Sequence, residues 1–235
     1  MTQSAQAASL LTSSGPSYSM APLHRGHTPP RVIGRDGYEK YRECLRLDFA
    51  YRCAYCLAHE VEVGPSGKFG GFEIEHFRPQ GRHEFRRFAN TYTNLLWACH
   101  ACNHAKDFGW PTAAEIAKGE RFVDPSAEPL GAFLTVAGDE VVPNPSEPAA
   151  TYMIEEIHLN SDLHQRRRKR RRDVATNIAT LKASLAIFKQ RLTPNATPME
   201  LAEIASAETS LSELSALTGV RAPWDEPEWC HCDSA

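Results

Sequence analysis

The chain has 235 residues, enough for one good-sized domain or for a small domain with appendages. Hydrophobic residues make up 42% and charged residues 23%, which excludes a collagen-like, a coiled-coil-only or a fully disordered protein. The net charge of −3 excludes a uniformly basic nucleic-acid coat.

We expect a cytoplasmic protein that does not bind a membrane. No apolar run approaches the length of a membrane-spanning helix, and the N-terminus lacks the basic and apolar regions of a signal peptide. Seven cysteines in such a protein are more typical of metal ligands or free thiols than of disulfides.

The sequence predicts an α+β fold. Residues 1–30 are rich in Ser, Ala, Thr and Pro and offer little to bury, so we interpret them as a flexible arm. Between Tyr38 and Arg52 apolar side chains recur at helical spacing, which predicts a helix. The alternation Phe72-Glu73-Ile74-Glu75 predicts a short, half-buried strand, and residues 94–107 are interpreted as a short helix or helical turn.

A connector rich in Pro and Gly is expected at residues 113–158, after a core region at 37–112. The turn Ala137-Gly138-Asp139 lies between two apolar segments and predicts one hairpin, with strands at 133–136 and 140–142.

Residues 159–220 are expected to be helical. One helix is predicted from Asp162 to about Leu192, and the capping box Thr197–Glu200 predicts a second helix that ends at Gly219. The first helix carries an apolar stripe of Val174, Ile178, Leu181, Leu185 and Phe188. Residues 221–235 form an acidic tail, in which the role of Cys230, His231 and Cys232 stays open.

Two Cys-x-x-Cys pairs, Cys53/Cys56 and Cys99/Cys102, are separated by 42 residues. Two such pairs can complete a closed tetrahedral shell of four sulfurs around one Zn2+ ion, with no position left for water. We therefore expect a structural zinc site, which contributes on the order of 10 kcal/mol of folding free energy in small zinc peptides. The alternatives are two unrelated pairs of buried cysteines or a redox Cys-x-x-Cys.

The two cysteine pairs and the residues between and directly after them follow a recognisable order. They are Cys53, Cys56, Glu75-His76-Phe77-Arg78-Pro79, Asn94-Leu95, Cys99, Cys102-Asn103 and Lys106. This order, over about 55 residues, resembles the HNH endonucleases of the ββα-metal fold. With Asp124-Pro125 and Leu159-Asn160 it also resembles a narrower group, the small HNH nucleases of bacterial anti-phage systems, of the Septu (PtuB) type and its retron-linked relatives.

The resemblance implies a zinc-stapled ββα-metal core and a role for each matching residue. His76 matches the general base, because a neutral imidazole can take a proton from the attacking water. Glu75 and Asn103 match the ligands of a catalytic Mg2+ or Mn2+ ion, and Asn94 matches the residue that holds the loop and helps to orient the histidine. His104 and Asp107 are additional ligand candidates, since Asp107 lies one helical turn after Asn103.

Two groups of cations are expected to contact nucleic acid, one beside His76 and one on the first C-terminal helix. An unbroken run of seven cations presents a high positive potential to any polyanion. A solvated helix face and an acidic protein partner are the alternatives. The residues are Arg78, Arg82, Arg86, Arg87, Lys106, Arg166, Arg167, Arg168, Lys169, Arg170, Arg171 and Arg172.

The leading hypothesis is a metal-dependent HNH endonuclease that hydrolyses DNA with one divalent cation. The resemblance implies an effector nuclease of an anti-phage defence system with an ATPase partner protein. The alternative is a non-catalytic, zinc-stapled nucleic-acid-binding or adaptor module, and RNA is a third substrate hypothesis.

Overall fold

The computed structural model describes residues 25–32, 37–63, 71–192 and 196–218. Short helices and two small sheets come first, and long helices follow. The elements up to the first sheet and its helix are η2 (Gly37–Tyr41), α1 (Arg42–Asp48), α2 (Glu60–Val63), β1 (Phe72–His76), η3 (His83–Phe88), η4 (Tyr92–Asn94), β2 (Leu95–Cys99) and α3 (His100–Lys106). They are followed by α4 (Ala113–Ala117), η5 (Leu130–Ala132), β3 (Leu134–Ala137), β4 (Glu140–Pro143), α5 (Pro148–Glu156), α6 (Asp162–Leu192) and α7 (Pro198–Thr218).

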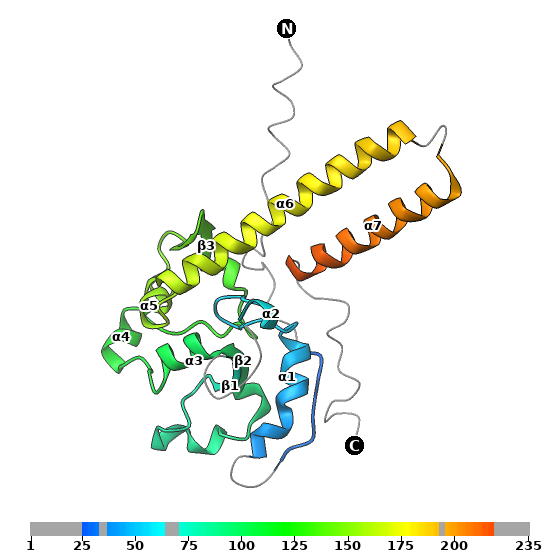
Figure 1. The fold of residues 1–235 in the computed structure, drawn as a ribbon. Helices are drawn as coiled ribbons and strands as arrows, with labels where there is room; N and C mark the ends of the chain where they lie inside the picture. The colour runs from blue at the N-terminus through cyan, green and yellow to red at the C-terminus, as the bar shows by residue number, and fades with distance from the viewer. Residues whose placement is uncertain (1–24, 33–36, 64–70, 193–195, 219–235) are drawn as a thin grey trace.

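The centre of the fold is an antiparallel pair of strands with a helix directly after it. Strand β1 pairs with β2, so that Phe72 lies opposite Cys99 and His76 lies opposite Leu95. Helix α3 begins at the residue after β2 and lies beside the two strands (Figure 1). All five residues of β2 are buried, because α1 and the segments around it cover the sheet with apolar side chains. The α+β class expected from the sequence is therefore confirmed.

The helix expected at 38–52 is present but ends early. Elements η2 and α1 cover Gly37–Asp48, and the chain then turns through Ala50 and Tyr51 with positive φ angles of 49° and 58°. This turn directs the chain toward Cys53.

The prediction of a helix at residues 94–107 was wrong for the first half of this segment. Residues 95–99 form the strand β2, and the helix starts only at His100. The run Leu-Leu-Trp-Ala-Cys is apolar throughout, and such a run has the same pattern in a buried strand and in a buried helix.

The hairpin and both long helices are confirmed. Strands β3 and β4 pair antiparallel around the expected turn, and α6 has the predicted bounds. Helix α7 is capped as expected, since Thr197 N–H donates to Glu200 Oε2 at 2.7 Å and Glu200 N–H donates to Thr197 Oγ1 at 3.3 Å. Gly219, the expected end of α7, and residues 221–235 lie outside the described residues. Helix α5 was not predicted.

Part of the expected N-terminal arm is in contact with the core. Arg25 donates to the carbonyl of Leu95 at 2.6 Å, and His27 Nδ1 lies 2.6 Å from Asp48 Oδ1. The expectation of a flexible arm is thus wrong for residues 25–30, because Asp48 and the backbone carbonyls of residues 92, 93 and 95 bind this segment. Residues 1–24 lie outside the described part of the chain.

The helices α6 and α7 form an antiparallel hairpin that projects from the rest of the protein (Figure 1). Only the first part of α6 packs on the body, where His164, Arg168 and Arg171 are buried. Among the helices of the described residues, none has both the length and the apolar character needed to cross a bilayer.

Candidate metal centre and neighbouring cavity

The four cysteines of the two Cys-x-x-Cys segments are buried and lie together. Their sulfur atoms all fall within 4.8 Å of one another, and the Cys56 and Cys99 sulfurs are 3.7 Å apart. Cys53 and Cys56 occupy a tight turn whose Ala54 N–H donates to the Trp97 carbonyl of β2 at 2.8 Å. Cys99 ends β2 and Cys102 lies in the first turn of α3. This set of donors could hold a metal ion such as zinc.

The four thiols affect the pKa values of one another. Hydrogen bonds from Cys102, Cys53 and Cys56 hold the pKa of Cys99 well below its ordinary value, while burial raises the pKa of Cys102. Thiolate is the form that binds a metal, so the cluster already stabilises the negative charge that a cation would neutralise.

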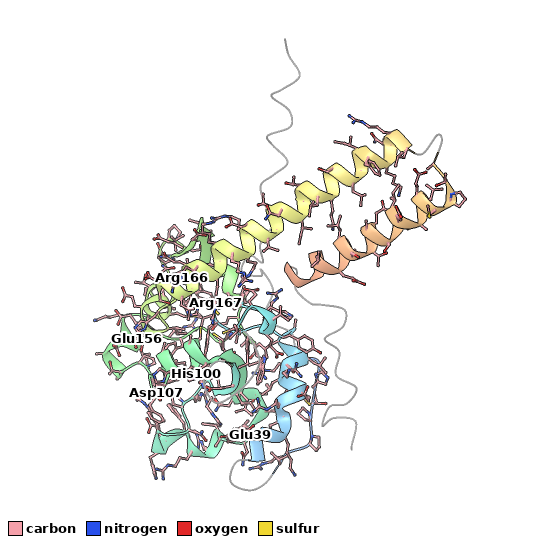
Figure 2. All side chains as sticks on the ribbon, in the orientation of Figure 1. Glu39, His100, Asp107, Glu156, Arg166 and Arg167 are labelled. Carbon is pink, nitrogen blue, oxygen red and sulfur yellow. The ribbon has the colours of Figure 1, made fainter. Side chains whose placement is uncertain are left out.

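The start of α6 brings an imidazole and a guanidinium to the edge of the cluster. His164 Nε2 lies 3.5 Å from the Cys102 sulfur, and Arg167 Nη1 donates to the Cys99 sulfur at 3.7 Å. Figure 2 places Arg166 and Arg167 where α6 meets the body of the protein. Four thiolates around a divalent ion leave a net negative charge, which a neighbouring guanidinium offsets. No motif in the sequence predicts these contacts.

The basic run is divided between the interior and the surface. Arg168 and Arg171 are 7% and 6% exposed, whereas Arg166, Lys169, Arg170 and Arg172 are exposed. Arg168 donates to the carbonyls of Asp139 and Leu159. The prediction that both arginines contact nucleic acid is therefore corrected, because internal acceptors engage them.

Arg171 is expected to stabilise the docking of α6. Its guanidinium donates to Glu62 at 2.8 to 3.1 Å, and the two side chains are 5% and 18% exposed. Arg171→Ala should lower the free energy of unfolding by about 2 kcal/mol, since it leaves Glu62 half-buried without this partner. Urea denaturation measures the effect, and Arg170→Ala, at an exposed position on the same helix, is the control that should change little.

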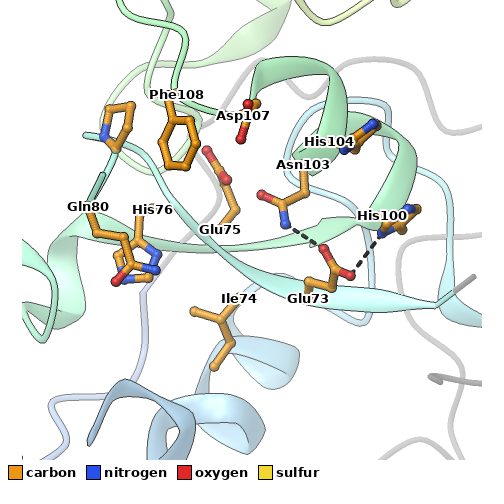
Figure 3. Close-up of a pocket in the computed structure, with 11 residues that line it drawn as sticks. Glu73, Ile74, Glu75, His76, Gln80, His100, Asn103, His104, Asp107 and Phe108 are labelled. Atoms are coloured by element: carbon orange, nitrogen blue, oxygen red, sulfur yellow. Dashed lines mark hydrogen bonds and ion pairs between the residues drawn. The ribbon is translucent and has the colours of Figure 1, made fainter. Parts of the chain in front are cut away.

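A cavity of about 250 Å³ lies between β1, the loop after it and α3 (Figure 3). It brings together five of the side chains selected from the sequence. They are Glu75, His76, Asn103, His104 and Asp107. The remaining lining residues are Glu73, Ile74, Pro79, Gln80, His100 and Phe108.

His76 is held by a backbone carbonyl. Its Nε2 lies 2.9 Å from the Ala89 carbonyl oxygen, and the ring edge contacts Tyr38 with centroids 4.7 Å apart. A carbonyl oxygen only accepts, so Nε2 carries the hydrogen and the neutral ring keeps its lone pair on Nδ1. The imidazole is 7% exposed, and burial lowers the pKa of His76 below its ordinary value. The neutral, proton-accepting form is therefore favoured near pH 7.

Asn94 holds the loop that positions this carbonyl. Its side-chain oxygen accepts from the Arg78 N–H at 2.9 Å, and its Nδ2 donates to the carbonyls of Arg78 and Phe88 at 3.2 and 3.3 Å. Phe88 directly precedes Ala89, so the amide fixes the backbone that orients His76. This position agrees with the loop-holding role expected for Asn94.

Glu75 forms a buried ion pair with Lys106. The distance from Lys106 Nζ to Glu75 Oε1 is 2.6 Å, and the two side chains are 0% and 4% exposed. Burial raises the pKa of Glu75 and the lysine opposes that shift. Lys106 also donates to the His76 carbonyl at 3.1 Å. The expectation that Lys106 contacts nucleic acid is corrected, because its ammonium group faces the interior.

Glu73 is a cavity residue that the sequence motif does not include. Its Oε2 accepts from Asn103 Nδ2 at 2.5 Å, and its Oε1 lies 2.9 Å from His100 Nδ1. Because the amide nitrogen of Asn103 faces Glu73, its oxygen faces Glu75 and Asp107 (Figure 3). The alternation Phe72-Glu73-Ile74-Glu75 contained the signal, since residues two apart on a strand share a face.

His104 and Asp107 also line the cavity. The His104 ring stacks on His100 with centroids 5.6 Å apart. Asp107 is the residue directly after α3 and has a φ of 41°, and its N–H donates to the Asn103 carbonyl at 2.8 Å. His100 pairs with Glu73 at 2.9 Å, and its side chain stays 42% exposed.

The loop after β1 carries the expected cations. Arg78, Arg86 and Arg87 are exposed. Arg82 donates to the carbonyls of Phe108 and Trp110 at 3.0 and 3.2 Å. The other three arginines are exposed and make no hydrogen bond of this kind among the described contacts.

Comparison with protein-family models, curated proteins and solved structures finds no match for this chain.

Proposed function

We propose that the chain is a metal-dependent endonuclease of the HNH type, with the cavity as its active site and the four cysteines as a structural Zn2+ site. The observation that carries the proposal is the arrangement at one cavity of an oriented, neutral imidazole and several oxygen donors. Nδ1 of His76 is the basic atom, while Glu75, Asn103 and Asp107 offer oxygens from β1, from α3 and from the residue directly after α3. A non-catalytic adaptor has no need of an imidazole held in this way.

In the proposed reaction His76 takes the proton of the attacking water at Nδ1. The Ala89 carbonyl keeps the opposite ring nitrogen protonated and stabilises the imidazolium that results. Glu75 and Asn103, with Asp107, are suited to a hard divalent cation such as Mg2+ or Mn2+. When bound, that ion supplies positive charge to the phosphate and the leaving 3′ oxygen.

Lys106 has a supporting role in this proposal. It pairs with one oxygen of Glu75, so the other carboxylate oxygen is the one suited to a cation. It also compensates the negative charge of Glu75 inside the protein.

Nucleic acid is the substrate that the surface charge supports. Arg78, Arg86 and Arg87 are exposed beside the cavity, and Arg166 and Arg170 are exposed on α6. Phosphate contacts of this kind position a duplex or a single strand without reading its sequence. The proposed role in anti-phage defence, together with an ATPase partner, rests on the motif resemblance alone.

The direct test is incubation of the purified protein with plasmid DNA and, in parallel, with RNA, in the presence of Mg2+ or Mn2+. Nicked products with 5′-phosphate and 3′-hydroxyl ends that disappear with chelator would support the proposal. Binding without cleavage in every metal tested would favour the adaptor.

Glu73 is expected to position Asn103 for this reaction. Glu73→Gln replaces an obligate acceptor with an amide, so the Asn103 amide loses its fixed orientation. The cleavage rate should fall about 10-fold and the Mg2+ concentration for half-maximal rate should rise, as is typical when a partner of a metal ligand is removed. The control is Glu84→Gln, in the neighbouring loop, where the side chain is 57% exposed. An unchanged metal dependence would exclude the positioning role.

A further inference from the structure

Exposed apolar side chains are concentrated on the α6–α7 hairpin. Eleven large hydrophobic residues of the described chain are exposed, and eight of them lie on these two helices. The eight are Leu163, Val174, Leu181, Ile187, Phe188, Met199, Leu201 and Leu214. Single exposed apolar residues are ordinary on a protein surface, but a group on one element marks a surface that binds a partner.

The hairpin buries little of its own apolar surface. Among the large aliphatic residues of α6 and α7 whose side chains the structure describes, only Ile178 and Ile204 are buried, at 6% and 5% exposure. Two helices in contact cover one stripe each and leave their flanks open. The hairpin also extends away from the body, which therefore does not cover those flanks (Figure 1).

One flank of α6 carries a continuous apolar line. Val174, Leu181 and Phe188 are seven residues apart, so they lie on one side of the helix. Their exposed fractions are 40%, 53% and 53%. Ile187 is equally exposed, at 52%, but points about 100° away from Phe188 around the axis.

The charges on the two helices are of opposite sign. After Asp173, α6 carries only the cations Lys182, Lys189 and Arg191. Helix α7 carries four glutamates and no lysine or arginine: Glu200, Glu203, Glu208 and Glu213. Within one hairpin Lys189 pairs with Glu208 at 2.8 Å. A second hairpin related by a two-fold axis would set the cationic α6 of each copy beside the anionic α7 of the other.

We propose that this apolar flank binds a second copy of the same chain, so that two hairpins form an intermolecular four-helix bundle. The two-fold arrangement covers Val174, Leu181 and Phe188 on both copies at once and pairs unlike charges around them. This inference does not depend on the nuclease proposal, because none of these residues lies at the cavity.

Light scattering coupled to gel filtration of the full chain tests the proposal. The wild type should have twice the chain mass of 26.2 kDa at micromolar concentration. Phe188→Glu should weaken self-association by roughly 100-fold or more, because it would bury an unpaired carboxylate. Ile187→Glu is the matched control, one residue away and equally exposed, and should leave the dimer intact.

Circular dichroism of both variants establishes that the helices are retained. A wild type that stays monomeric across the concentration range overturns the proposal, including the case in which the flank binds a different protein. Equal behaviour of Phe188→Glu and Ile187→Glu overturns it as well.

Discussion

Replacing His76 with alanine is expected to reduce phosphodiester cleavage by about 10²- to 10⁴-fold, the range over which a positioned general base contributes. The ring is suited to that role by position and by charge. The Ala89 carbonyl fixes Nε2 as the donor, and burial lowers the pKa so that Nδ1 is free to accept a proton. The rate of plasmid nicking under single-turnover conditions measures the loss.

The variant must remain folded for the result to bear on catalysis. His76→Ala removes one hydrogen bond and one ring contact, so the free energy of unfolding should fall by about 1 kcal/mol. His83→Ala is the matched control, since His83 is an exposed histidine in the segment after β1, and this variant should cleave as the wild type does. Nicking by His76→Ala at the wild-type rate, with His83→Ala also unchanged, would remove the imidazole from the mechanism.

The long helices and the hairpin could be predicted because their signals are local. Asp162–Leu192 and β3–β4 depend on capping residues, turn residues and periodicity, all of which lie within the segment itself. The strand β2 could not be predicted. Its conformation depends on pairing with β1 and on the apolar side chains of distant residues that cover it. A uniformly apolar run has no hydrophobic period that distinguishes a strand from a helix.

The cavity was predicted in part, through side chains that follow a motif. His76 and Asn103 line the cavity, and Asn94 holds the loop beside His76. Glu73 was missed because nothing in the motif selects it, and only the register of β1 brings its carboxylate to Asn103.

The basic run illustrates the opposite error. Seven consecutive cations suggest one function, but a helix turns them toward different environments. Arg168 and Arg171 bond to interior acceptors and Arg167 contacts Cys99, while Arg166 and Arg170 face outward. Charge alone could not separate these roles, because the acceptors are contributed by residues as distant in the chain as Glu62.

The largest expected effect on stability comes from the four cysteines. Cys102→Ala should leave the protein unfolded at 25 °C, because an ion held by four thiolates contributes on the order of 10 kcal/mol and a domain has about 5 to 15 kcal/mol in total. The same substitution at Cys44 is the matched control, because that thiol is also fully buried but lies outside the cluster. Cys44→Ala should cost about 1 kcal/mol.

Circular dichroism and elemental analysis together measure this prediction. The wild type should contain one zinc per chain and lose both the metal and its helical signal when a strong chelator is added.

Loss of the ion should also release α6, because His164 and Arg167 contact the sulfurs of Cys102 and Cys99, whose charge the ion would no longer neutralise. Hydrogen exchange at the start of α6 would then rise before that of β3–β4, whose pairing is independent of the cluster. A Cys102→Ala protein as stable as Cys44→Ala, or a wild type without bound metal, would contradict the assignment of a structural ion. The four thiols would then be ordinary core residues, and the positions of β2 and α3 would depend on apolar packing alone.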